Sequence, residues 1–288
     1  MLKDNTYSQE NWTEIISPKR SLLDVNLSEI WRYRDLIMLF VRRDFVSQYK
    51  QTILGPIWLF IQPLFTTLTF FFVFNQIAKI PTDNIDPILF YLSGITLWNY
   101  FSDCFNKTSN TFVANAGIFG KVYFPRLATP ISIVFSNLIK LGIQVLLFLA
   151  IMGYQIIFKG AEVNINSHIF ILPYLIILMA VMGLGLGIIF SALTTKYRDL
   201  SFLLTFGIQL LMYATPIIYP LSYTGGKLHT IISMNPLTPI MESFRYAFFS
   251  IGSFDWSGLA YTSIFSFGVL FLGIIIFNQV EKSFMDTV

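Results

Sequence analysis

Long apolar stretches alternate with short polar ones along most of the chain, and this pattern predicts membrane-spanning helices. A helix of about 20 apolar residues is long enough to cross a bilayer, and the chain after residue 52 contains six stretches of roughly that kind. The predicted spans are 53–74, 88–105, 127–158, 169–193, 200–219 and 259–277. The expected fold class is therefore an all-α integral membrane protein whose residues 53–288 form one domain of six transmembrane helices.

A different period precedes the first span, between residues 28 and 52. Apolar side chains recur there at three- and four-residue steps, and basic side chains fall mostly elsewhere. The apolar positions are Ile30, Tyr33, Ile37, Phe40, Val41 and Phe45, and the basic ones are Arg32, Arg34, Arg42, Arg43 and Lys50. This arrangement is typical of a basic amphipathic helix in the headgroup layer, so an N-terminal interface helix is expected. Residues 1–27 are polar without a period and predict a cytosolic lead-in.

Two stretches do not fit the pattern of simple spans. Residues 106–126 are too polar to cross a membrane, and their length suits a short helix that lies along its surface. Residues 220–251 are apolar but are broken by prolines and glycines, and they contain Glu242 and Arg245. A full crossing would bring both charges to membrane depth, so we expect re-entrant helices that protein covers. The alternative, a true crossing over residues 231–251, would move the C-terminus outside.

Composition supports a membrane protein and narrows its partners. Hydrophobic residues make up 55% of the chain and charged ones 12%, against roughly 25% charged residues in soluble domains. Lys and Arg concentrate in the segments that are cytoplasmic if the N-terminus is inside, so the positive-inside rule places both termini in the cytoplasm. With a net charge of only +3, membrane lipids are expected partners and nucleic acid is not.

The sequence contains no recognisable catalytic, metal or nucleotide site. Gly183, Gly185 and Gly187 mimic a nucleotide-binding spacing, but they lie inside an apolar run with no preceding strand, which favours helix packing. No phosphate-binding loop occurs elsewhere, and the single cysteine, Cys104, has no partner at metal-ligand spacing. We therefore expect no enzyme activity and no cofactor in this chain, and we expect another subunit to supply the energy.

Two sets of residues are candidates for function. The first lies in the inner loops, where aromatic and charged side chains would offer anchors to a cytosolic partner; the alternative is that these charges merely follow the positive-inside rule. Its members, with the interface-helix arginines, are Arg42, Arg43, Lys121, Tyr123, Arg126, Tyr197, Arg198 and Asp199, with Phe119 and Phe124 as further anchors. The second is a pair of polar stripes on apolar helices, explained by helix packing or by a wet substrate pathway. These stripes are Gln62, Thr66 and Thr69, and Ser201, Thr205, Gln209 and Tyr213.

Lys140 lies in the middle of the third predicted span, where a charge costs at least roughly 2.5 kcal/mol. Asn137 and Gln144 share its helix face, so the lysine is expected to point at protein or water. One interpretation is a buried contact with an acid, Asp103 or Glu242. The other is that the ammonium meets an anionic group of a substrate, which would place Lys140 in the substrate pathway.

Four stretches carry a family resemblance: RRDFVSQYKQTILGPIW, GKVYFPRLATPIS, TTKYRDL and NPLTPIMESFRYAF. In order, and across nearly the whole chain after Leu27, they resemble the permease subunits of type-two ABC exporters of polysaccharide. The chain looks most like Wzm-like O-antigen permeases, and permeases for teichoic acid and capsule are close relatives. The lead-in before residue 28 is longer than this family requires.

The resemblance implies a homodimer with six spans per subunit, working with two copies of an ABC ATPase subunit. It places the interface helix at residues 42–50, the coupling region at 106–126 and a second inner contact at Tyr197, Arg198 and Asp199. The implied function is ATP-driven export of a lipid-linked polysaccharide across the cytoplasmic membrane, and export of teichoic acid or capsule is the alternative. A rival class, a glycan flippase or glycosyltransferase that works without ATP, would require acidic or metal-binding groups at a membrane face.

Overall fold

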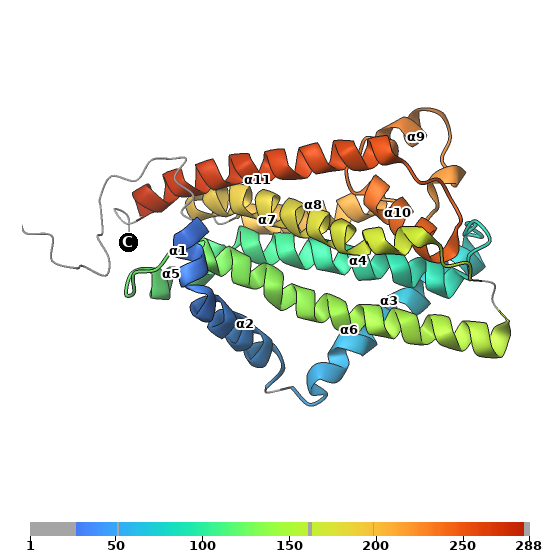
Figure 1. Cartoon of the computed structure of the whole chain (residues 1–288), viewed down its shortest axis with the longest axis horizontal. Helices are drawn as coiled ribbons and strands as arrows, with labels where there is room; N and C mark the ends of the chain where they lie inside the picture. The colour runs from blue at the N-terminus through green and yellow to red at the C-terminus, as the bar shows by residue number, and fades with distance from the viewer. Residues whose placement is uncertain (1–26, 51, 161–162, 198, 285–288) are drawn as a thin grey trace, which may run out of the picture.

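The protein is a bundle of helices that run along one long axis (Figure 1). This computed structural model describes residues 27–50, 52–160, 163–197 and 199–284, and the secondary structure within them is helical. The α-helices are α1 (Leu27–Arg32), α2 (Arg34–Tyr49), α3 (Trp58–Phe70), α4 (Pro87–Ser109), α5 (Thr111–Phe119), α6 (Ala128–Lys159), α7 (Leu172–Lys196), α8 (Leu200–Tyr213), α9 (Gly226–Ser233), α10 (Thr238–Phe249) and α11 (Trp256–Phe284). Short 3-10 turns at Gly55–Ile57, Ser167–Ile171 and Leu221–Tyr223 and a π-helical segment at Phe71–Ile77 join or extend them.

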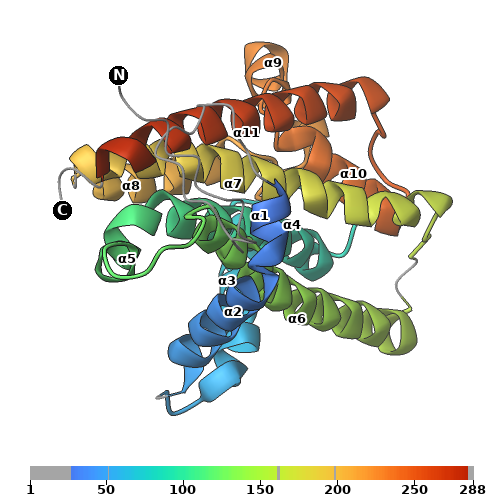
Figure 2. The ribbon, with the colours of Figure 1, turned by 60° about the vertical axis from the view of Figure 1, so that its left-hand side comes forward.

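Helix α4 forms the centre of the bundle. Its side chains are buried over most of its length, and it packs against α3, α6, α7, α8 and α10. Both views place α11 and α7 on one side of α4, with α2 and α3 on the other (Figures 1 and 2). Asp86 caps the start of α4, since its carboxylate accepts hydrogen bonds from the backbone N–H groups of Ile88 and Leu89. The capped end fixes where the central helix begins.

The three glycines of α7 act in helix packing, as the sequence predicts. A Cβ on Gly187 would lie 2.5 Å from the Cβ of Thr108 on α4, and one on Gly183 would lie 3.0 Å from the Cβ of Cys104. Gly185 faces the opposite way, where a Cβ would come within 2.7 Å of the backbone of Leu270 on α11. Because no side chain intervenes, α7 approaches both neighbours closely.

Four helical stretches of the described residues are long and apolar enough to cross a membrane: Gly55–Ile77, Ala128–Lys159, Ser167–Lys196 and Trp256–Val280. They correspond to the first, third, fourth and sixth predicted spans. Helix α4 matches the second in position but is more polar, and it continues to Ser109, so the predicted coupling region begins inside it. The predicted fifth span is too long, because α8 ends at Tyr213 rather than at residue 219.

The early end of α8 has a physical cause in the segment that follows it. Pro216 lacks a backbone N–H, and the carbonyl groups there bind side chains from later in the chain. The Asn235 amide donates to the carbonyl of Ala214, and the Arg245 guanidinium donates to those of Pro216 and Ile217. These bonds hold the chain in a turn where the sequence predicts more helix.

Arg245 and Glu242, the two charges of the predicted re-entrant region, lie on the short helix α10. Nη1 of Arg245 is 3.5 Å from a Glu242 carboxylate oxygen, and the guanidinium lies 3.7 Å from the centre of the Phe90 ring. The Arg245 residue is only 3% exposed. Helices α9 and α10 have 8 and 12 residues, which is too short for either to cross a bilayer alone at about 1.5 Å per residue.

The predicted interface helix is present, but it is divided in two at Tyr33. Three of the positions on its predicted apolar face, Ile37, Phe40 and Val41, are buried. This face packs against protein rather than lipid, in a cluster that includes Phe124 and Ala128. Other apolar residues of these helices, Trp31, Met38 and Leu39, are exposed. The predicted lead-in lies outside the described residues, except for Leu27.

Candidate functional site

One end of the bundle gathers α2, α5, the start of α6 and the link between α7 and α8; we name it the α2–α5 end (Figure 1). A hydrogen bond from the Thr194 hydroxyl to the carbonyl of Ser109 joins the ends of α7 and α4 there. Two predicted aromatic anchors are accessible at this end, since Tyr123 is 45% exposed and Tyr197 is 51% exposed. Lys121 and Asp199 are exposed beside them. The end therefore offers rings and charges to a partner.

Three other residues predicted for the same surface are instead inside the protein. Phe119 and Phe124 are buried in a cluster with Phe40, and Arg126 is 6% exposed with its guanidinium over the Phe119 ring. The interpretation of these three as surface anchors is wrong. The loop folds back on itself before α6 begins, so two of its rings are needed to cover the end of the core. Sequence alone does not separate Phe124 from its exposed neighbour Tyr123.

The interface-helix arginines differ from each other. Arg42 is exposed, whereas Arg43 is fixed by contacts with Asp44 (2.8 Å), Asn115 on α5 (3.5 Å) and the Phe40 ring. Arg43 therefore links α2 to α5. Arg198 lies outside the described residues.

Lys140 on α6 is paired with an acid, as one of the two interpretations predicts. Its ammonium lies 2.6 Å from the Asp103 carboxylate on α4, and the two side chains are 13% and 29% exposed. Asp103 also approaches the end of α2: burial raises the pKa of the Tyr49 phenol to about 12, and the negative charge of Asp103 contributes to this rise. The pair thus joins α4 to α6.

Lys107, one turn further along α4, has different partners. Its ammonium donates to the amide oxygens of Gln48 on α2 (3.3 Å) and Asn137 on α6 (3.2 Å). Sequence reasoning missed this residue because it falls among the other basic positions of the inner loops. The signal that could have found it is its four-residue spacing from Asp103, which places both on one face of α4.

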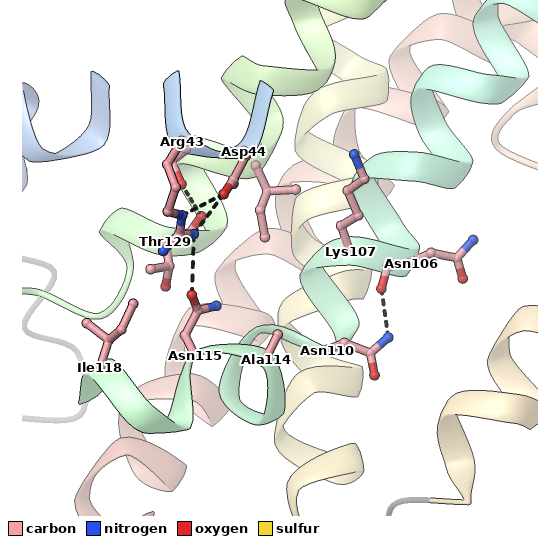
Figure 3. Close-up of a pocket in the computed structure, with 11 residues that line it drawn as sticks. Arg43, Asp44, Asn106, Lys107, Asn110, Ala114, Asn115, Ile118 and Thr129 are labelled. Atoms are coloured by element: carbon pink, nitrogen blue, oxygen red, sulfur yellow. Dashed lines mark hydrogen bonds and ion pairs between the residues drawn. The ribbon is translucent and has the colours of Figure 1, made fainter. Parts of the chain in front are cut away.

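A polar cavity of about 470 Å³ opens at the α2–α5 end, between α2, α4, α5 and α6. Figure 3 shows Arg43 and Asp44 of α2 on one side of it, near Asn115 of α5, and Lys107 and Asn110 at the end of α4 on the other; the side chain of Asn106 points away. Thr129, Ser132 and Ile133 of α6 complete its lining. Within the described residues, no three His, Cys, Asp or Glu side chains come together as metal ligands would. The cavity is suited to a ligand that accepts hydrogen bonds.

The two polar stripes lie on exposed helix faces. On α3, Gln62 and Thr69 are exposed and Thr66 is half-buried, and on α8 Thr205, Gln209 and Tyr213 are exposed, with Ser201 half-buried. The threonine hydroxyls donate to carbonyls of their own helices. Within one chain α3 packs on α4 and α6, whereas α8 packs on α4 and α7. A single chain therefore does not bring the stripes together.

Comparison with known proteins matches residues 35–249 to the model of the ABC-2 type transporter family. An O-antigen export system permease protein, RfbA, of Klebsiella pneumoniae is 27% identical over 252 residues, covering 88% of this chain and 94% of that protein. Its namesake in Myxococcus xanthus is 24% identical, covering 90% of this chain and 98% of that protein. The polysialic acid transport protein KpsM of Escherichia coli is 22% identical, covering 85% and 93%.

The family match spans the interface helix, the coupling region and α10, the elements from which the α2–α5 end and the buried Arg245 contact are built. It covers well over half of the chain. The protein belongs to the ABC-2 type transporter family.

Proposed function

We propose that this chain is the permease subunit of an ATP-driven exporter that moves a lipid-linked polysaccharide of the O-antigen type across the cytoplasmic membrane. The observation that carries the proposal is similarity to O-antigen export permeases over 88–90% of the chain. The α2–α5 end supports it, since exposed tyrosines and charges are suited to a partner that hydrolyses ATP. In this proposal ATP and Mg bind the partner subunit.

The proposed topology has six spans and places both termini and the α2–α5 end in the cytoplasm. Helix α4 would cross with the four apolar helices, as would α8 together with residues 214–219 that follow it, and α9 and α10 would re-enter from the outer side. The contacts of Arg245 support re-entry, because they supply partners for a charge and for backbone carbonyls at that depth.

The proposed assembly is a homodimer with two ATPase subunits. Helix α8 has one buried residue, Ile208, and α3 has three, so both present wide surfaces to lipid or to a second copy. If these helices meet their counterparts at a dimer axis, the two polar stripes line one pathway. The substrate would then pass along Gln62, Thr66 and Thr69 and along Ser201, Thr205, Gln209 and Tyr213.

A second candidate substrate is a capsular polysaccharide or a teichoic acid. Similarity to the polysialic acid transport protein KpsM, at 22% identity over 85% of this chain, favours the capsular one. Both candidates use the same transport mechanism and differ in the glycan.

The test is transport by the purified permease together with its ATPase subunit, reconstituted in vesicles. We expect ATP-dependent movement of a lipid-linked glycan to the far leaflet, measured by its exposure to an added lectin or glycosidase. The same vesicles without the ATPase serve as the control. Transport at equal rate without the ATPase or without ATP would contradict the proposal and favour an ATP-independent flippase.

A further inference from the structure

The polar cavity at the α2–α5 end has the composition of an anion site. Its polar lining carries two cations and several amide or hydroxyl groups, but only one acid, Asp44. Its charged donors are Arg43 and Lys107. The amides of Asn106, Asn110 and Asn115 already donate hydrogen bonds within α4 and α5, and the hydroxyls of Thr129 and Ser132 donate to the backbone carbonyls of Arg126 and Thr129. A second cavity of about 230 Å³ shares Lys107 and Asp44 with the first and extends its polar lining to Gln48 and Ser136. The first cavity alone falls in the size range of ligand pockets, roughly 300–1,000 Å³.

Lys107 is the cation of this cavity whose charge no acid balances. Both of its hydrogen-bond acceptors, on Gln48 and Asn137, are neutral amide oxygens. Within the described residues, no carboxylate forms an ion pair with it. An ammonium held only by neutral groups gains more from an anionic ligand than one already paired, because charge-assisted hydrogen bonds are the stronger ones.

Lys140 shows the opposite arrangement one helix away. Its ammonium contacts the Asp103 carboxylate at 2.6 Å, so its charge is already balanced inside the protein. An anionic substrate group would therefore gain more from contact with Lys107 than from contact with Lys140.

Arg43 supplies the second cation. Its Nε and Nη2 atoms are bound to Asp44 at 2.9 and 2.8 Å, which fixes the plane of the guanidinium. The Nη1 group makes no hydrogen bond with the described residues, and the side chain is 40% exposed. A guanidinium has five N–H donors in a rigid fork, so a bound anion can use the donors that Asp44 leaves open.

An apolar groove beside α2 and α6, two of the helices that line the polar cavity, indicates that the anion is attached to a hydrocarbon chain. It has a volume of about 610 Å³ and lies between α1, α2 and α6, where Trp31, Met38, Phe135 and Leu138 line it. Trp31 and Met38 are 71% and 67% exposed. The polar cavity and this mainly apolar groove thus border the same contact between α2 and α6. This combination suits an anionic group attached to a hydrocarbon chain better than a soluble anion.

We propose that the polar cavity binds the phosphate or diphosphate group of a membrane lipid, with Lys107 and Arg43 as its cations. The inference rests on the proposed function, in which the phosphate group comes from the substrate: a lipid-linked glycan carries such a group between the lipid and the first sugar. An anionic phospholipid offers the same chemistry without the sugar. Bound here, the group lies between the interface helix and the coupling helix α5, the two elements proposed to meet the ATPase.

The test is lipid binding by the permease with its ATPase in nanodiscs of phosphatidylcholine. The dissociation constant of a prenyl diphosphate lipid is measured for the wild type, Lys107→Gln and Arg43→Gln, with Lys159→Gln as the matched control. Lys159 is exposed at the far end of α6, a helix of 32 residues. We expect about tenfold weaker binding for each cavity variant, as the loss of a charge-assisted contact implies, and no change for Lys159→Gln.

Two further variants separate the site from folding. Lys107→Arg keeps the charge and should bind like the wild type, whereas Ala114→Phe on α5 fills the cavity without changing charge and should weaken binding. If Lys107→Gln does not assemble with the ATPase, the affinities of Lys107→Arg, Arg43→Gln and Ala114→Phe still test the site. Equal affinity in the wild type, Arg43→Gln and Ala114→Phe overturns the proposal.

Competitors identify the source of the anion. Displacement by phosphatidylglycerol at similar concentration supports the site and assigns it to bulk phospholipid, and resistance to displacement assigns it to the substrate. Inorganic pyrophosphate that binds as tightly as the lipid overturns the lipid assignment. Failure of this site remains distinct from failure of the proposed function, because vesicle transport by the wild type is measured separately.

Discussion

The two ends of the bundle treat their cations in opposite ways. At the α9–α10 end, Arg245 is buried, and its guanidinium contacts Glu242, two backbone carbonyls and the Phe90 ring. At the α2–α5 end, the acceptors that Lys107 has among the described residues are neutral amides, and Arg43 is 40% exposed. A cation that the protein surrounds with its own partners holds the fold together, and one with unused capacity is available to a ligand. Lys140, paired with Asp103, lies between these extremes.

The largest effect is expected at Arg245. Arg245→Met removes the donors for the carbonyls of Pro216 and Ile217 and leaves Glu242 without its cation. Breaking a buried pair in this way costs about 3–5 kcal/mol of unfolding free energy. The midpoint of thermal unfolding in detergent measures the loss. Arg42→Met, at an exposed arginine, is the matched control and should leave the midpoint unchanged. An unchanged midpoint in Arg245→Met would contradict the claim that the buried arginine stabilises the fold.

A smaller loss is expected at Lys140. Lys140→Met leaves the Asp103 carboxylate unpaired, but Asp103 is 29% exposed, so we expect about 2–3 kcal/mol, below the range for fully buried pairs. A double-mutant cycle with Asp103→Asn measures the coupling, because the second change should cost little once the first is made. A stable Lys140→Met protein that cannot export would instead support a direct contact with substrate.

The exposed tyrosines of the α2–α5 end should affect coupling without affecting stability. Tyr123→Ala and Tyr197→Ala should each weaken ATPase binding by about 1–2 kcal/mol, as anchors at the centre of an interface do. Export and substrate-stimulated ATP hydrolysis report the effect. Tyr154→Ala provides the control, since Tyr154 is 54% exposed on the opposite half of α6. Equal ATPase affinity in all three variants would place the docking surface elsewhere.

The subtlest difference is expected along the polar stripes. In a Cys104→Ala background, Thr69→Cys and Gln209→Cys should react with a water-soluble thiol reagent in the assembled transporter, because thiols in water ionise. Thr67→Cys and Ile208→Cys are matched controls on the same helices, where the native residues are 1% and 6% exposed, and they should stay protected. Protection of all four positions would indicate that the stripes face lipid or pack at an interface.

Much of the architecture follows from local pattern. The limits of α6 differ from the predicted third span by one residue at each end, because a long, mainly apolar run can satisfy its backbone hydrogen bonds in a bilayer only as a helix. The helical contacts of Gly183 and Gly187 and the buried face of α2 were likewise predictable from spacing. The second and fifth spans agree less well with the prediction. Helix α4 is more polar than the other predicted spans, and α8 ends early because residues of α10 and of the turn before it bind the carbonyl groups that follow α8.

Local sequence pattern was therefore enough for the fold class, the family resemblance and most of the long helices, because apolar length and residue spacing act within a short segment. It also indicated which acids Lys140 could meet. The packing of the helices settles that Asp103 is its partner, that Phe124 is buried while Tyr123 is exposed, and that the described hydrogen-bond acceptors of Lys107 are neutral amides. Those outcomes depend on which helices become neighbours, and the strength of a charge's interactions is set by groups that lie far from it in the chain.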